Sequence, residues 1–147
     1  MLEKYLKKYS AWSMLFLRVA IGVVFLVHGL GKLLNVGPTA IGVQNFSGYL
    51  ASLGVPLPLL AAWIVTLAET FGGLAILFGL FTREAALLLS LDMLTAFFLV
   101  HLPNGFAVQN GGYEMVLLLF FGCLTLLFSG PGEKCVLMGM KSKKKRA

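Results

Sequence analysis

Five ionisable side chains stand where an otherwise apolar sequence leaves little water to solvate them. They are His28, Lys32, Glu69, His101 and Glu114. Histidine titrates near neutral pH, and a carboxyl group removed from water can hold a proton. A group of this composition could exchange protons with a small ligand or bind its polar head. The alternative is that these side chains only join helices to one another through salt bridges and hydrogen bonds.

Glu69 is the most unusual of the five. It is the only ionisable residue in the apolar run 59–81, and it falls near the middle of that run. We expect such a carboxylate to be protonated, partnered or beside water. Counted at about 1.5 Å per residue, Glu69 lies near the midplane of a bilayer and the other four lie in its outer third. His28 and Lys32 are four positions apart, so they share one helix face.

Histidine, lysine and acid at interface depth suit a quinone headgroup or another small polar ligand. The sequence therefore predicts a candidate ligand or proton site, with no catalytic residue assigned. No metal site is expected, because the spacing of His28 and His101 matches no ligand motif. Cys123 and Cys135 are twelve positions apart and form no C-x-x-C pair, which argues against a dithiol or zinc site.

A second pair of charges falls nearer the opposite surface. Arg18 lies about 8 Å and Asp92 about 10 Å from that end of their apolar runs, at about 1.5 Å per residue. An unpaired charge in hydrocarbon is costly, and the guanidinium fork matches a carboxylate. We therefore predict a structural ion pair between Arg18 and Asp92.

The composition predicts a membrane protein. Of the 147 residues, 59% are hydrophobic and 12% are charged, against about 45–50% and about 25% in soluble domains. The net charge of +6 does not indicate nucleic-acid binding, because the basic residues gather at the ends of the chain. The bilayer is therefore the first expected partner.

The apolar runs predict an all-α fold, a polytopic membrane four-helix bundle. The expected spans are about residues 13–34, 59–81, 85–102 and 111–128. The segment 35–58 mixes apolar with polar side chains between Pro38 and Pro56, which indicates a short helix lying on the membrane surface between the first two spans.

Small residues recur along the second span. Ala68 with Gly72, and Ala75 with Gly79, form small-xxx-small pairs, and Gly73 lies beside them. Such residues let two helix backbones come close. We expect Gly72, Gly73 and Gly79 to serve helix packing.

The distribution of basic residues predicts the orientation. With four spans, both termini share one side with Arg83, and only Lys32 faces the other. By the positive-inside bias, both termini are expected in the cytoplasm of an inner (plasma) membrane protein. The basic tail 133–147 would serve as a topology anchor, with added attraction to anionic lipid headgroups as the alternative.

The ordered set of motifs resembles the DoxX family over roughly residues 15–132. The resemblance begins at Arg18 and continues through the segments 28–33, 46–50, 68–73 and 79–83. It extends through Asp92-Met93 and the segments 101–106, 112–114 and 130–132. It implies one four-helix membrane domain over residues 1–132, followed by the basic cytoplasmic tail.

The resemblance implies one fold but several different functions. Some family members are small subunits of quinol oxidase or thiosulfate:quinone oxidoreductase assemblies, and others are membrane partners in complexes handling thiol and oxidative stress. Distant relatives are chaperones or cargo receptors. The family fold is therefore a better guide to structure than to function.

Three functions remain open from the sequence. The first is a membrane subunit of a quinone-linked oxidoreductase, with quinone as its ligand, no intrinsic cofactor, and a redox protein as partner. The second is a non-catalytic scaffold, assembly factor or chaperone. The third, a small-solute transporter, would need a homo-oligomer to make room for a path.

Overall fold

The computed structural model describes residues 2–135, and the described chain is helical without strands. Its α-helices are α1 (Leu2–Tyr9), α2 (Ser13–Leu34), α3 (Val43–Ser52), α4 (Pro58–Phe78), α5 (Thr82–Ala96) and α6 (Glu114–Ser129). Short 3-10 turns occupy Ser10–Trp12 (η1), Leu102–Asn104 (η3) and Val108–Asn110 (η4), and a π-helical turn occupies Phe97–His101 (η2). The predicted tail lies outside the described residues from residue 136 onward.

Three of these helical segments are long and apolar enough to cross a membrane. They run from Leu6 to Leu34, from Pro58 to Phe78 and from Thr82 to Asn104. The helix α6 is equally apolar but has 16 residues, which makes it about 24 Å long. The predicted class, an all-α membrane bundle, is confirmed. A helix is present between the first two spanning helices, as α3.

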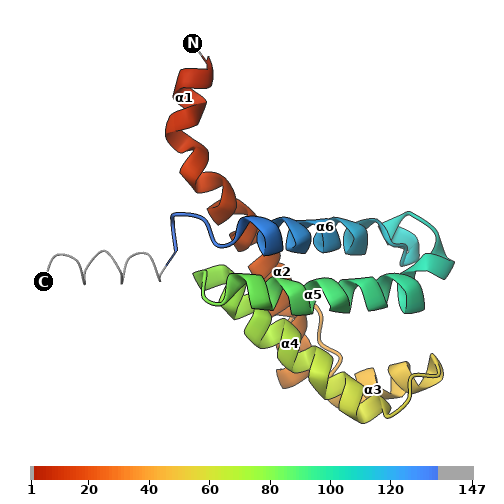
Figure 1. Cartoon of the computed structure of the whole chain (residues 1–147). Helices are drawn as coiled ribbons and strands as arrows, with labels where there is room; N and C mark the ends of the chain where they lie inside the picture. Colours follow the sequence, from red (N-terminus) through yellow and green to blue (C-terminus); the bar gives the residue numbers. More distant parts are fainter. Residues whose placement is uncertain (1, 136–147) are drawn as a thin grey trace, which may run out of the picture.

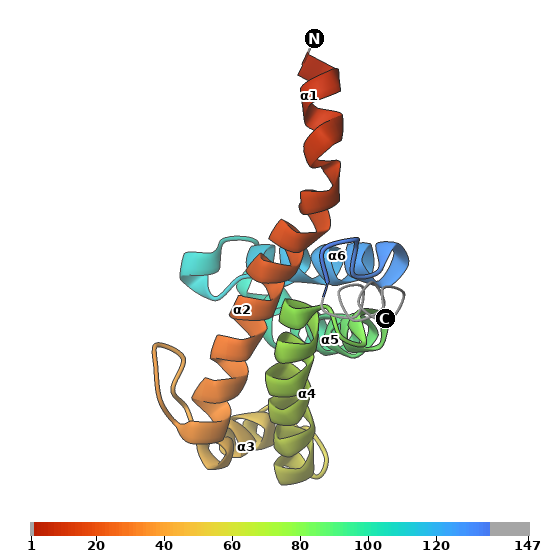
Figure 2. The same cartoon turned by 90° about the vertical axis from the view of Figure 1, so that its left-hand side faces the viewer.

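The helices pack as two antiparallel pairs that meet along α4 and α5. The helix α2 packs mainly against α4, α5 packs against α6, and α4 also contacts α5 (Figure 1). The helix α3 lies across one end of α4, and α1 leads through η1 into α2 and stands out from the bundle (Figure 2). The loop after α2 and the loop before α6 lie away from α1, and the candidate outer residues belong to the helical turns next to these loops.

The boundary between α4 and α5 differs from the prediction. The turn was expected at 82–84, but these are the first residues of α5. The helix α4 ends because Gly79 is left-handed, with φ of 72°, and the amide of Leu80 donates to the carbonyl oxygen of Ala75 at 2.8 Å. This arrangement is a frequent glycine C-cap, and it satisfies carbonyls that the helix end leaves free.

The start of α6 also differs from the predicted 111. Residues 111–113 instead pair with the preceding loop, and the amide of Tyr113 donates to the carbonyl oxygen of Gly105 at 3.0 Å. Gly112 has no room for a side chain, because a Cβ there would meet the backbone of residues 105–107. The helix therefore begins at Glu114, three residues later than predicted.

One apolar core holds the helix pairs together. It is formed by Ile21, Phe25, Ile76, Ala85, Ala86, Leu89, Met93, Val116, Cys123 and Leu126. A smaller cluster of Val43, Leu50 and Ala62 fixes α3 on α4. The second cluster matters for the site, because it covers one side of the space between α2 and α4.

Candidate functional site

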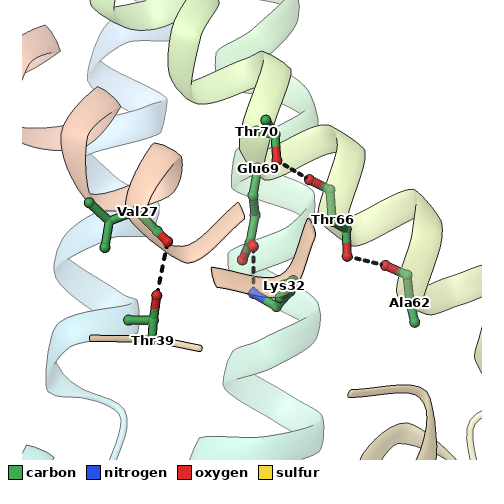
Figure 3. Close-up of polar contacts among 7 residues, drawn as sticks. All are labelled: Val27, Lys32, Thr39, Ala62, Thr66, Glu69 and Thr70. Carbon is green, nitrogen blue, oxygen red and sulfur yellow. Dashed lines mark hydrogen bonds and ion pairs between the residues drawn. The ribbon is translucent and has the colours of Figure 1, made fainter. Parts of the chain in front are cut away.

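An ion pair between α2 and α4 lies at the centre of the candidate site. Nζ of Lys32 lies 2.5 Å from Oε2 of Glu69, and their side chains are 11% and 6% exposed (Figure 3). Lys32 comes from the last turn of α2 and Glu69 from the middle of α4. Glu69 is therefore partnered, and the predicted separation of the two residues in depth is wrong.

The error in depth has a structural reason. Gly29 lies against Thr70, because a Cβ on Gly29 would be 2.5 Å from the amide nitrogen of Thr70. The two helices are antiparallel, so the end of α2 is level with about the second turn of α4. The first residues of α4 extend beyond α2, beneath α3 (Figure 1). Counting from the two span ends as if they were level placed Lys32 too far from Glu69.

Glycines let the two helices approach closely enough for this pair. A Cβ on Gly73 would lie 2.7 Å from the amide nitrogen of Leu26 and 3.0 Å from the carbonyl oxygen of Gly22. Gly72 faces α5, where a Cβ would be 3.0 Å from the side chain of Leu89. Gly73 and Gly72 thus serve two different helix contacts. Gly79 forms the C-cap of α4 and also packs closely, because a Cβ there would lie 2.8 Å from the guanidinium carbon of Arg18 on α2.

The neighbouring threonine hydroxyl groups donate to backbone carbonyl oxygens and not to Glu69. Thr66 donates to the carbonyl oxygen of Ala62 and Thr70 donates to that of Thr66, both at 2.7 Å (Figure 3). On the other side, Thr39 donates to the carbonyl oxygen of Val27 at 2.9 Å and folds the loop back on the end of α2. Lys32 and Glu69 are therefore held by elements whose own polar groups are satisfied.

A cavity of about 450 Å³ lies beside the ion pair. Its wall is mostly apolar and comes from α2, α3, α4, α5, η2 and α6. Its lining residues with ionisable side chains are His28, Lys32, Tyr49, Glu69, Asp92 and His101. The predicted group is thus brought together around one space, with Asp92 in the place of Glu114.

The cavity runs from buried carboxyl groups to an open side. Glu69 is buried, whereas His28, Tyr49, Leu99 and Met115 are exposed side chains that also line it. In a bilayer, exposed apolar side chains at this edge face acyl chains. The open side therefore suits a ligand that enters from lipid.

The predicted pair between Arg18 and Asp92 does not exist. Arg18 is 2% exposed and donates to four carbonyl oxygens, at 2.8–3.0 Å. These are the carbonyls of Ile76, Leu77, Pro131 and Lys134. The last carbonyls of a helix lack intrahelical partners and carry partial negative charge, so they satisfy a guanidinium without a carboxylate. Equal depth did not mean that the two side chains faced each other.

Asp92 instead lines the cavity without a hydrogen-bond partner. Its Oδ2 atom is buried, and within residues 2–135 no donor reaches it. Thr95, Ala96 and Leu99 follow on the same side of the helix and also line the cavity. This i, i+3, i+4, i+7 spacing is the signal in the sequence that could have assigned Asp92 to the site.

His101 and Glu114 have structural contacts in the loop that closes the outer end. Nδ1 of His101 lies 2.6 Å from the carbonyl oxygen of Gly111, and His101 still lines the cavity. Glu114 accepts a hydrogen bond from the amide of Val108 at 2.6 Å and is not part of the lining. The structure therefore does not place Glu114 with the other predicted residues, and its hydrogen bond anchors the loop 105–113 to the start of α6.

Apolar helices of spanning length around a cavity with a few ionisable groups define an integral membrane protein with an internal cavity. Its sequence matches the DoxX profile over residues 13–102. The chain belongs to the DoxX family.

The relatives carry different names, and one of the three described here is named as an inner membrane protein. An uncharacterized protein of Haemophilus influenzae is 34% identical, over 86% of this chain and 90% of its own. The inner membrane protein YqjF of Escherichia coli is 33% identical, over 86% and 91%. A Bacillus subtilis protein named "Putative oxidoreductase CatD" is 33% identical over 71% of each chain. No solved structure matches the chain significantly.

Proposed function

We propose that this protein is the quinone-binding membrane subunit of an oxidoreductase. The observation that carries the proposal is the cavity lined by His28, Lys32, Glu69, Asp92 and His101. A volume of about 450 Å³ falls in the range of about 300–1,000 Å³ typical of small-molecule sites. A quinone has a flat apolar ring with polar oxygens at two ends, which fits an apolar wall carrying a few polar groups.

The residues around the cavity would hold such a headgroup without performing the electron transfer themselves. Lysine and histidine can donate hydrogen bonds to a carbonyl oxygen, and the carboxyl groups can exchange protons. Lysine, histidine and carboxyl side chains are not redox centres, so a redox partner must supply or accept the electrons. The name of the Bacillus subtilis relative supports an oxidoreductase role.

The scaffold alternative rested on the glycines of the second span as a surface for other helices. Gly72 and Gly73 contact α5 and α2 of the same chain, so this surface is used internally. Co-purification of a stoichiometric membrane partner, with function retained after Glu69→Gln and His28→Ala, would favour the scaffold. Loss of function in these variants would favour the ligand site.

The proposed orientation places both termini in the cytoplasm at the inner membrane. Lys134 lies over the ring of Trp12 at 5.4 Å, and Arg83 donates to the carbonyl oxygen of Leu127. The basic residues therefore gather at one end of the bundle, and the loops 35–57 and 102–113 carry no lysine or arginine. This asymmetry favours a cytoplasmic basic end. A carboxyl-terminal alkaline phosphatase fusion should be inactive; activity would reverse the proposed orientation.

Binding to the purified protein tests the function. In detergent, the wild-type protein should bind ubiquinone-1 or menadione, measured by equilibrium dialysis. Leu99→Trp fills the cavity from its lining and should abolish binding. Leu118→Trp makes the same change at an exposed position outside the lining and should leave binding unchanged. Absence of binding to the wild-type protein, or equal effects of the two variants, would contradict the proposal.

A further inference from the structure

Among the ionisable side chains that line the cavity, Asp92 is the one with a buried polar atom that has no hydrogen-bond partner within residues 2–135. Glu69 has Lys32 as its partner, and His101 contacts the carbonyl oxygen of Gly111. The buried Oδ2 atom of Asp92 has no partner among residues 2–135. Buried polar atoms in folded proteins are almost always hydrogen-bonded. Asp92 as a residue also lines the cavity, so its carboxyl group, which no protein donor satisfies within residues 2–135, lies beside a space that a ligand can fill.

The chemistry of a carboxyl group limits what that ligand presents. An ionised carboxylate only accepts hydrogen bonds, whereas a protonated carboxyl group also donates one. A hydroquinone carries hydroxyl donors, and the oxidised quinone carries only carbonyl acceptors. The ionised side chain therefore matches the reduced ligand, and the protonated side chain matches the oxidised ligand.

We propose that Asp92 is the proton-exchanging residue of the site, binding the reduced ligand as a carboxylate and the oxidised ligand as a carboxylic acid. The proposal rests on the quinone-binding function above and adds a residue and a selectivity to it. Binding of the oxidised form to ionised Asp92 takes up one proton from solvent. Binding of the reduced form to protonated Asp92 releases one proton to solvent. No electron moves in either step.

The proposal predicts that pH changes the preference between the two forms. The dissociation constant of the oxidised form divided by that of the reduced form should rise with pH. A charge-assisted hydrogen bond is about twice as strong as a neutral one, so the ratio should change by about tenfold across the titration. Other titratable groups that line this space are His28, Lys32, Tyr49, Glu69 and His101, and Cys123 in the apolar core is close enough to Asp92 to be affected by its charge.

The test is a set of anaerobic titrations of the full-length protein in detergent with ubiquinone-1 and ubiquinol-1 from pH 5 to pH 9. Wild-type protein should show the rising ratio. Asp92→Asn has nearly the same shape, can donate and accept at any pH, and should bind both forms with a constant ratio. Glu114→Gln makes the matched change outside the cavity lining and should keep the wild-type slope.

The outcomes separate the two proposals. A flat ratio in the wild-type protein, or a slope that persists in Asp92→Asn, overturns the role of Asp92 while leaving quinone binding intact. Failure of the wild-type protein to bind either form at any pH overturns both proposals. If circular dichroism and gel filtration show that Asp92→Asn does not fold, Asp92→Ser replaces it. The ratio of dissociation constants should again be constant with pH, and a ratio that still rises with pH would again overturn the role of Asp92.

Discussion

Breaking the ion pair between Lys32 and Glu69 from one side should destabilise the protein far more than removing both charges together. The two atoms lie 2.5 Å apart, which corresponds to an attraction of ~7 kcal/mol at an effective dielectric constant of about 20. Desolvation of each ion costs several kcal/mol, so the net value of the intact pair is small. Removing one partner leaves that cost without the attraction.

Methionine is the replacement for Lys32 and for Glu69, because its side chain is apolar, flexible and of suitable length. Lys32→Met and Glu69→Met should each lower the unfolding free energy by about 2–3 kcal/mol, because each leaves a buried charge alone. The double variant should lie within about 1 kcal/mol of the wild-type protein. The coupling energy of this double-mutant cycle is then at least about 3 kcal/mol.

The unfolding free energies of the wild-type protein, the two single variants and the double variant are measured by reversible unfolding in mixed micelles with increasing sodium dodecyl sulfate. Unfolding is followed by circular dichroism. Lys7→Met is the matched control, since Lys7 is exposed on α1 and forms no ion pair within residues 2–135. It should leave the unfolding midpoint nearly unchanged. If the effects of the two single variants simply add in the double variant, the reasoning about the buried pair is refuted.

Two further predictions concern packing and helix capping. Arg18→Met should lower the unfolding free energy by about 3 kcal/mol, because it removes four buried or part-buried hydrogen bonds to backbone carbonyls. Arg83 is exposed and makes one such bond, so Arg83→Met should have little effect in the same unfolding assay. Gly73→Ala should cost at least about 2 kcal/mol, because its Cβ would press on the backbone of α2. Gly48→Ala, with open space around it, should instead stabilise α3 by about 0.5–1 kcal/mol. Equal effects within either pair would contradict these assignments.

The sequence predicted the helices well where composition alone decides them. The first span was predicted at 13–34, where α2 is found. An apolar run of this length in a bilayer has to be helical, because every backbone group needs an internal partner. The ends of α4 and the start of α6 were less predictable. They depend on a left-handed Gly79 and on pairing between residues 105–107 and 112–114.

Four of the five residues predicted for the candidate site line the cavity, but the contacts among them were not predicted. His28, Lys32, Glu69 and His101 stood out because ionisable residues in apolar runs are rare. Which of them touch depends on how far α2 is offset along α4, and this offset is set by Gly29 and its contact with Thr70. Depth counted from span ends contains no information about that offset or about rotation of a helix around its axis. For this reason Asp92 was assigned to Arg18.

The charged side chains inside the bundle have three different kinds of surroundings, and the differences bear on function. Arg18 is satisfied by backbone carbonyls at a helix end, and Lys32 and Glu69 satisfy each other. Both arrangements are complete without a ligand, which is what a structural role requires. Asp92 is neither capped nor paired within the described chain, and it borders the cavity. A structural role alone would favour an apolar residue at this position, because an unsatisfied carboxyl group weakens the fold. The chemistry of the site should therefore be sought at Asp92 first, with the ion pair beside it as the support that fixes the wall.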